Sequence, residues 1–327
     1  MSEAARNTAA DVSQRDDALP RLPARTIDGH KGTFGTVLVV GGCAAPPRTM
    51  VGGPAFAALA ALRSGAGLAI LAMPTPLLVA GLTIAPSATG VALPVTELGE
   101  LRPAAVAEAL DALGSAPRCI ALGPGLGRGP APEQVTLRLV ARDSVPLVID
   151  ADALNALAAT PEFAGDLQAP AVLTPHPGEY RRLASALGLR CDPEDPSRRT
   201  EAAEALARRL GCVVVLKGRG TVVSDGITSW TNRSGNAALG TAGTGDVLTG
   251  IVASFIAQFA RRGGSTPDGD GRPSRHPPLS LFDCARLAVA AHALAADRWA
   301  ARRGAAGVLA AELADELPET IEAMRGA

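Results

Sequence analysis

The sequence has few aromatic side chains, almost no net charge and no long apolar run. Aromatic residues make up 3% of its 327 residues, which leaves little material for stacking against nucleic-acid bases. The net charge of −1 gives no general attraction to nucleic acid or to anionic membranes. No uncharged apolar run reaches the roughly 18 residues of a membrane span. We therefore expect no nucleic-acid partner and no membrane partner.

Cysteine is scarce and scattered. The five cysteines never form a C-x-x-C pair, which argues against a zinc site and fits a reducing compartment. Residues 1–25 contain no apolar segment of the signal-peptide kind. We expect a cytoplasmic protein.

Two common nucleotide-binding signatures are missing. No Gly-x-x-x-x-Gly-Lys-Ser/Thr occurs, and Gly123-Pro-Gly-Leu-Gly127 has the wrong third spacing for a dinucleotide-binding fingerprint. Lysine is also rare: of 31 lysines and arginines, only Lys31 and Lys217 are lysine, and both precede a glycine. Lysine binds phosphate as a compact point charge, so these two positions are candidate phosphate contacts.

Short apolar runs alternate with amphipathic helical stretches from residue 36 onward. Continuous apolar runs are typical of strands buried on both faces, so the pattern predicts a largely parallel central sheet with helices on both faces. Residues 221–224 and 227–230 are predicted to form a hairpin. The predicted strands are 36–40, 68–72, 119–122, 146–149, 171–173 and 212–216, and the predicted helices are 54–64, 103–113, 132–142, 179–187, 197–210, 246–260, 281–303 and 307–316.

Composition predicts one α/β domain over residues 26–327. Residues 1–25 are rich in Ala, Arg and Asp and are predicted to be a disordered leader. Residues 261–278 are rich in Gly, Pro, Arg and Asp and are predicted to be a mobile insertion between two helices.

Glycines and polar residues follow the predicted strands repeatedly. In an open parallel sheet, ligands bind beyond the carboxyl ends of the strands, so these segments are expected to meet at one edge. They are Gly41-Gly42, Gly123–Gly127, Asp150–Asn155, Thr174–Glu179 and Lys217–Thr221.

The loop Gly240-Thr-Ala-Gly-Thr-Gly-Asp246 leads directly into a predicted helix. A glycine loop that opens a helix offers unpaired N–H groups and the positive end of the helix dipole to an anion. Asp246 would lie in the first turn, either as a simple N-terminal carboxylate or as a base beside an anion hole. We favour the base.

These motifs resemble the ribokinase-like superfamily and, within it, the ADP- or ATP-dependent NAD(P)H-hydrate dehydratases. The resemblance runs from about residue 26 to the C-terminus. The motifs that carry it are Lys31-Gly-Thr-Phe-Gly-Thr36, Ala61-Leu-Arg-Ser-Gly-Ala-Gly67, Gly123–Gly127, Thr174-Pro-His-Pro-Gly-Glu179, Lys217-Gly-x-x-Thr221 and Gly243-Thr-Gly-Asp246-Val-Leu-Thr-Gly250.

The resemblance implies a ribokinase-like three-layer fold and a hydro-lyase. The implied reaction restores NADH or NADPH from the hydrated forms NADHX or NADPHX (S epimer), with ADP converted to AMP and phosphate. The sequence does not decide whether the enzyme uses ADP or ATP. The resemblance also implies a homo-oligomer such as a tetramer. Many relatives carry an additional N-terminal epimerase domain, and from the shortness of residues 1–25 we expect none here.

The resemblance also implies roles for particular residues. Asp246 would be the catalytic base and contact the substrate. The adenine nucleotide would contact Lys217, Gly218, Arg219, Gly220, Thr221 and Gly245. The hydrated nicotinamide nucleotide would contact Gly53, where relatives often have alanine, together with Gly125 and His176. Magnesium would be held, through water, by Glu179 and by Asp152 or Asp150.

Two other functions stay open from the sequence. One is a small-molecule kinase of the same superfamily that acts on a vitamin precursor. The other is a catalytically inactive nucleotide sensor. The segments at 31–36 and 174–179 favour the dehydratase over the kinase, and the intact Gly-x-Gly-Asp argues against the sensor.

Overall fold

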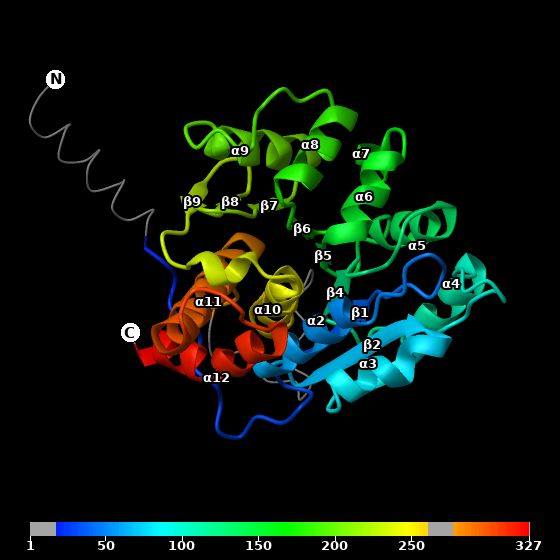
Figure 1. Ribbon diagram of the computed structural model, residues 1–327, viewed down its shortest axis with the longest axis horizontal. Helices are drawn as coiled ribbons and strands as arrows, with labels where there is room; N and C mark the ends of the chain where they lie inside the picture. Colours follow the sequence, from blue (N-terminus) through cyan, green and yellow to red (C-terminus); the bar gives the residue numbers. More distant parts are fainter. Residues whose placement is uncertain (1–17, 261–276, 327) are drawn as a thin grey trace, which may run out of the picture.

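A computed structural model of the chain describes residues 18–260 and 277–326. Within these residues, nine strands form a single sheet in the order β3-β2-β1-β4-β5-β6-β7-β8-β9 (Figure 1). Strands β1 to β7 run parallel, and β8 and β9 are antiparallel. The strands are β1 (Thr36–Val40), β2 (Leu68–Pro74), β3 (Thr89–Leu93), β4 (Cys119–Leu122), β5 (Leu147–Ile149), β6 (Ala171–Leu173), β7 (Val213–Leu216), β8 (Val222–Ser224) and β9 (Ser229–Thr231).

The apolar runs are buried on both faces because helices cover both sides of the sheet. Strand β1 is buried along its whole length. Its side chains alternate, so Val37 and Val39 belong to one core and Leu38 and Val40 to the other. The sequence prediction of a three-layer α/β fold is therefore confirmed.

Different sets of helices form the layers on the two faces of the sheet (Figure 1). One core is packed by α2 (Gly52–Arg63), α3 (Leu78–Ile84), α10 (Thr244–Phe259), α11 (Leu281–Arg303) and α12 (Ala310–Gly326). The other is packed by α4 (Pro103–Asp111), α5 (Pro130–Val140), α6 (Ala151–Ala159), α7 (Phe163–Asp166), α8 (Pro177–Ala186) and α9 (Arg199–Leu210). None of the helices in the described residues is both long and apolar enough to cross a membrane.

Most predicted elements are present, and the hairpin is confirmed as β8 and β9. The sequence missed β3, an edge strand whose residues are mostly exposed and which therefore has no apolar run. It also missed the helices α3, α6 and α7. The predicted helix 307–316 begins later, at Ala310, and continues to Gly326.

The predicted domain boundary at residue 26 differs from the structure. Residues 18–25 lie on the domain: Leu22 is buried, and the Arg25 guanidinium stacks 3.6 Å from the centre of the Phe34 ring. Arg25 also donates a 2.8 Å hydrogen bond to the carbonyl of Gly65. The remainder of the predicted leader, residues 1–17, and residues 261–276 of the predicted insertion lie outside the described residues.

Helices α2 and α10 approach each other closely at Gly250. A Cβ at this position would lie 2.2 Å from the carbonyl oxygen of Ala57 and 2.9 Å from the Cβ of Ala60. The absence of a side chain thus lets the two backbones pack directly. This contact fixes α10, which carries Asp246, against α2, which carries Gly53.

We predict that Gly250→Ala lowers the free energy of unfolding by about 1–3 kcal/mol, because the new methyl group must push the helices apart. Chemical denaturation measures this loss. Gly165→Ala is the matched control, because a Cβ there would have no neighbour within 4 Å in the described residues. Equal stability of the two variants would contradict the prediction.

Candidate active site

The segments that follow the central strands meet at the carboxyl edge of the sheet, as the sequence predicts. The amide of Gly42, after β1, donates to the carbonyl of Pro124, after β4, at 3.1 Å. A Cβ at Gly123 would lie only 2.0 Å from the carbonyl oxygen of Asp150, after β5. The amide of Lys217, after β7, donates to the carbonyl of Pro175, after β6, at 2.9 Å. Parallel strands therefore gather these loops into one site.

A buried ion pair lies at the centre of this edge. The Lys217 ammonium is 2.6 Å from Oδ1 of Asp150 and 3.9 Å from Oε2 of Glu179. The other oxygen of Asp150 accepts a 2.7 Å hydrogen bond from the Thr249 hydroxyl. Burial lowers the pKa of Lys217, but the neighbouring carboxylates outweigh it and leave the pKa raised. The lysine is therefore a fixed positive charge.

Asp246 lies in the first turn of α10, directly beside this pair. Gly243 begins the turn with φ of +91°, a conformation that glycine adopts without strain. A Cβ at Gly53 would lie 3.1 Å from Oδ1 of Asp246, so α2 packs against the carboxylate. Burial, and then the charge of Asp150, raise the pKa of Asp246 to about 7, although Lys217 opposes the shift.

The start of α10 offers unpaired backbone donors. In the described residues, the amides of Gly245 and Asp246 donate to no protein acceptor, as expected at a helix N-terminus. A Cβ at Gly245 would lie 3.6 Å from the Lys217 ammonium, so the ammonium lies close to the first turn of α10. The arrangement is suited to a phosphoryl group.

The His176 turn approaches the site from β6. The Nδ1 atom of His176 accepts from the amide of Gly178 at 2.9 Å, which assigns the proton of a neutral ring to Nε2. Glu179 in turn accepts from the amide of His176 at 2.8 Å, which completes a capping box at the start of α8. Burial raises the pKa of Glu179 to about 7, with Lys217 opposing. Burial, followed by Lys217, lowers the pKa of His176.

The Lys217–Thr221 loop is held from beneath by a buried arginine. Arg199 donates to the carbonyls of Leu216 and Lys217 at 3.0 and 3.1 Å. Gly218 has φ of +140°, and the Thr221 hydroxyl donates to its carbonyl at 2.9 Å. The loop therefore has a fixed shape beside the ammonium of Lys217.

Residues 37–319 match the family model described as NAD(P)H-hydrate dehydratase. The chain belongs to the NAD(P)H-hydrate dehydratase family. A bifunctional NAD(P)H-hydrate repair enzyme of Moorella thermoacetica is 38% identical over 304 residues, which cover 91% of this chain and 51% of that protein. The chain spans about half the length of the curated relatives it matches.

Solved structures agree with this membership. The ADP/ATP-dependent NAD(P)H-hydrate dehydratase of Bacillus subtilis, co-crystallised with ATP and Mg²⁺, is 28% identical with a TM-score of 0.70, over 93% of this chain and 95% of that one. A ribokinase-like superfamily protein of Enterococcus faecalis shares the fold at 24% identity and a TM-score of 0.70, over 93% and 92% of the two chains. The predicted ribokinase-like fold is confirmed.

The structure brings most of the predicted site residues of this NAD(P)H-hydrate dehydratase family member together, while their individual roles stay predictions. Lys31 does not join them: it is exposed and precedes β1, at the opposite edge of the sheet. Arg219 belongs to the loop but is exposed. The predicted residues that interact with the Lys217 ammonium or lie close to it are His176, Glu179, Gly245 and Asp246. Gly218, Gly220 and Thr221 belong to the same loop as Lys217, Gly53 lies against Asp246, and Gly125 lies against Met50 and Pro54 at the start of α2.

The predicted magnesium ligands do not form a shared cluster. Asp152 accepts a 3.0 Å hydrogen bond from the amide of Gly127 and lies 3.8 Å from Nε of Arg128, so its carboxylate contacts the end of the Gly123–Gly127 loop. Both oxygens of Asp150 are taken by Lys217 and Thr249. In residues 18–260 and 277–326, no three His, Cys, Asp or Glu side chains are placed to hold a metal ion.

Sequence reasoning missed the residues that support the site from behind. His292 is buried and its Nε2 lies 2.8 Å from the carbonyl of Thr244, the first residue of α10. Asp297 accepts from the amide of Gly235 at 2.9 Å and from the side-chain amide of Asn236 at 2.8 Å. These contacts join α11 to the glycine loop across 48 to 62 residues of sequence, so no local pattern signals them.

We predict that Asp246→Asn raises the melting temperature at pH 8 more than at pH 5. In the unfolded chain an aspartate ionises near pH 4, whereas the folded pKa of Asp246 is about 7. Between these values the unfolded state binds fewer protons, so the carboxyl costs more stability as the pH rises. Asparagine removes that cost.

Thermal unfolding followed by circular dichroism at both pH values measures the difference. Asp166→Asn controls for the loss of one negative charge at an exposed position. A melting-temperature gain that is equal at pH 5 and pH 8 would show that the Asp246 carboxyl is not destabilised by its ionisation.

Proposed function

We propose that this chain catalyses the nucleotide-dependent dehydration of NADHX and NADPHX, in the S configuration, to NADH and NADPH. The adenine nucleotide is consumed in the reaction, with ADP yielding AMP and phosphate. One observation carries the proposal: in a chain of this family, the half-buried carboxyl of Asp246 has a pKa of about 7 and lies in a helix turn with unpaired amides, close enough to Lys217 for the ammonium to lower that pKa.

Asp246 is suited to act as a general base. A base with a pKa near the working pH is partly ionised and still binds a proton strongly. Asp246 removes the proton of the ring hydroxyl, and that oxygen attacks the terminal phosphorus of the nucleotide. The amides of Gly245 and Asp246, with Lys217, stabilise the negative charge on the phosphoryl oxygens.

The hydroxyl is thereby converted into a better leaving group. The carbon–oxygen bond of the new phosphate ester breaks as the neighbouring ring nitrogen donates its electron pair, which forms a carbon–nitrogen double bond with a positive charge on nitrogen. Phosphate departs with the former hydroxyl oxygen. The ring carbon bonded to the one that held the phosphate then releases a proton, and the electron pair of that carbon–hydrogen bond forms the carbon–carbon double bond while the nitrogen regains its lone pair. In sum, the substrate has lost the elements of water.

The loop Lys217–Thr221 supports the assignment of the nucleotide. Its two positive-φ glycines leave backbone amides open beside the ammonium, which suits phosphates. Magnesium, when bound, would neutralise charge on the nucleotide phosphates. Glu179 fits a water-mediated contact to this ion, because magnesium keeps much of its hydration shell and binds through one or two carboxylates plus phosphate.

We further propose a cytoplasmic homo-oligomer, with a tetramer as the form suggested by the family resemblance. The five cysteines are all free, which supports a reducing compartment. The family match favours dehydration over the two alternatives, a vitamin-precursor kinase and an inactive nucleotide sensor.

Asp246→Asn should abolish most turnover of NADHX in the presence of ADP or ATP. The wild-type rate should rise between about pH 6 and pH 8, as the Asp246 carboxyl loses its proton. Recovery of NADH absorbance measures both. An Asp246→Asn rate within about tenfold of wild type would exclude the general-base role, which is typically worth 10²–10⁴-fold. No recovery of NADH by the wild type would contradict the function itself.

Lys217→Ala should weaken nucleotide binding. The ammonium lies 3.6 Å from where a Cβ of Gly245 would be, and its loss also leaves Asp150 buried without its counter-ion. Calorimetric titration with ADP measures the affinity. Lys217→Arg is the informative companion, because it keeps the charge but cannot reproduce the compact ammonium. Unchanged affinity in the alanine variant would refute the phosphate contact.

A further inference from the structure

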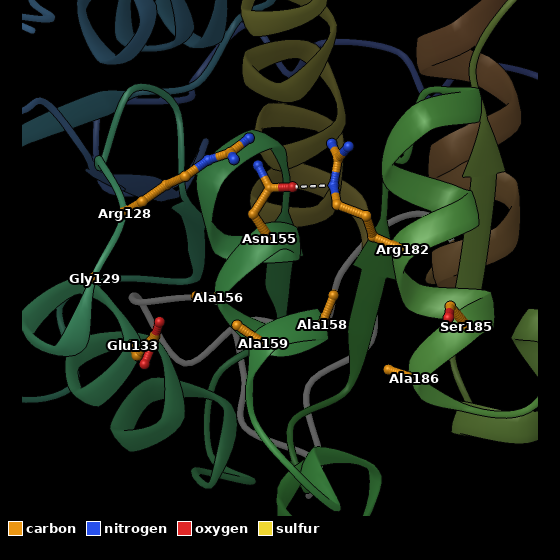
Figure 2. Close-up of a pocket in the computed structure, with 10 residues that line it drawn as sticks. All are labelled: Arg128, Gly129, Glu133, Asn155, Ala156, Ala158, Ala159, Arg182, Ser185 and Ala186. Atoms are coloured by element: carbon orange, nitrogen blue, oxygen red, sulfur yellow. Dashed lines mark hydrogen bonds between the residues drawn. The ribbon is translucent and has the colours of Figure 1, made fainter.

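A pocket opens between α5, α6 and α8, next to the proposed active site (Figure 2). Its volume of about 410 Å³ is within the range of small-molecule sites. Two arginines, Arg128 and Arg182, approach Asn155 from opposite sides, as Figure 2 shows. The rest of the wall is formed mainly by small side chains, namely Ala156, Ala158, Ala159 and Ala186, with Glu133 and Ser185 at the rim.

The pocket borders both predicted contacts of the nicotinamide nucleotide. Arg128 directly follows the Gly123–Gly127 loop, which contains Gly125. Arg182 NH1 lies 3.8 Å from where a Cβ of Gly178 would be, and the same point is 2.7 Å from the His176 ring. A ligand that touches Gly125 and His176 can therefore extend into this pocket, away from the loop Lys217–Thr221.

The two guanidinium groups are held in place but keep open donors. Arg182 donates through Nε to Asn155 Oδ1 at 2.7 Å, and Asn155 donates to Asp152 at 3.4 Å. Asp152 also lies 3.8 Å from Nε of Arg128. In the described residues, no terminal nitrogen of either arginine donates a hydrogen bond to the protein. Asp152 thus orients Arg128 directly through its Nε, and orients Arg182 through Asn155, which binds the Nε of that arginine.

We propose that this pocket binds the adenosine-diphosphate half of the hydrated dinucleotide, with the diphosphate on Arg128 and Arg182 and the adenine ring on the alanine-lined wall. The proposal rests on the proposed function. Guanidinium groups bind phosphate through paired donors, and the small side chains leave room for a flat ring. Glu133 is placed to accept from the exocyclic amine of adenine, which is a donor. Asp152 becomes a positioning residue for the arginines.

The assignment separates the two nucleotides in space. The helices that line this pocket cover one face of the sheet, whereas Asp246 and Gly53 come from helices on the other face. The dinucleotide crosses the carboxyl edge over β4, β5 and β6, while the phosphate donor lies over β7. The reactive hydroxyl and the transferable phosphoryl meet at Asp246.

Fluorescence titration with NADH, the product, and with reduced nicotinamide mononucleotide, which lacks the adenosine monophosphate half, tests the proposal. Wild-type protein should bind NADH more tightly. Ala159→Trp fills the alanine-lined wall at an exposed position and should weaken NADH binding about tenfold or more, leaving the mononucleotide unchanged. Arg128→Gln with Arg182→Gln should weaken NADH binding by a similar factor, through the loss of charge-assisted hydrogen bonds.

Arg181→Gln is the matched control, because Arg181 neighbours Arg182 but pairs with Glu194 at 2.8 Å and does not line the pocket. Unchanged NADH affinity in the pocket variants, or an equal loss for both ligands in Ala159→Trp, would overturn the proposal. Equal wild-type affinity for the two ligands would do the same. These binding results are independent of turnover, so failure of wild-type protein to dehydrate NADHX would instead reject the proposed function.

Discussion

The ion pair between Lys217 and Asp150 is the interaction on which the site depends. It joins the ends of β5 and β7, and Thr249 extends it to α10 through the second oxygen of Asp150. Two buried charges are expensive to desolvate, so the pair holds together only because each oxygen and the ammonium have partners. Its position limits where a phosphate can be placed, since the ammonium lies close to the first turn of α10.

One ammonium is shared by two buried carboxyl groups, Asp150 and Glu179, and the half-buried carboxyl of Asp246, and this imbalance affects their protonation. Asp150 makes the direct 2.6 Å contact, whereas Glu179 is 3.9 Å away. Burial therefore dominates for Glu179 and Asp246, and the pKa of each rises to about 7. A site in which only one of three acids contacts the lysine closely provides a base that exchanges protons near neutral pH, at a cost in stability that folding elsewhere must offset.

The sequence revealed the sheet and the central acid because both depend on local pattern. Unbroken apolar runs identify strands buried on both faces, and Gly-x-Gly-Asp before a helix identifies Asp246. Lys31 was misread because its glycine neighbours resemble those of Lys217, although one precedes a strand and the other follows one. Helix α6 was not predicted, although it begins at Ala151 and turns the Asp152 carboxylate toward Gly127. The apolar spacing over residues 153–157 was the available helix signal. Arg199 and Asp297 act on distant backbone, which no local pattern records.

Close packing around Asp246 explains a substitution that the family resemblance suggests. A Cβ at Gly53 would be 3.1 Å from Oδ1 and 3.4 Å from Oδ2 of the carboxylate, which is tight but requires a shift of only a few tenths of an ångström. Alanine can therefore occupy this position, provided that α2 or the carboxyl moves slightly. At Gly250, one turn further along α10, the obstacle is a backbone carbonyl at 2.2 Å, and no such shift is available without separating the helices. The α2–α10 pair thus tolerates a larger residue at Gly53, where the neighbour is a side chain, and resists one at Gly250, where the neighbour is backbone. The backbone contact at Gly250 keeps Asp246 in position relative to the ammonium of Lys217.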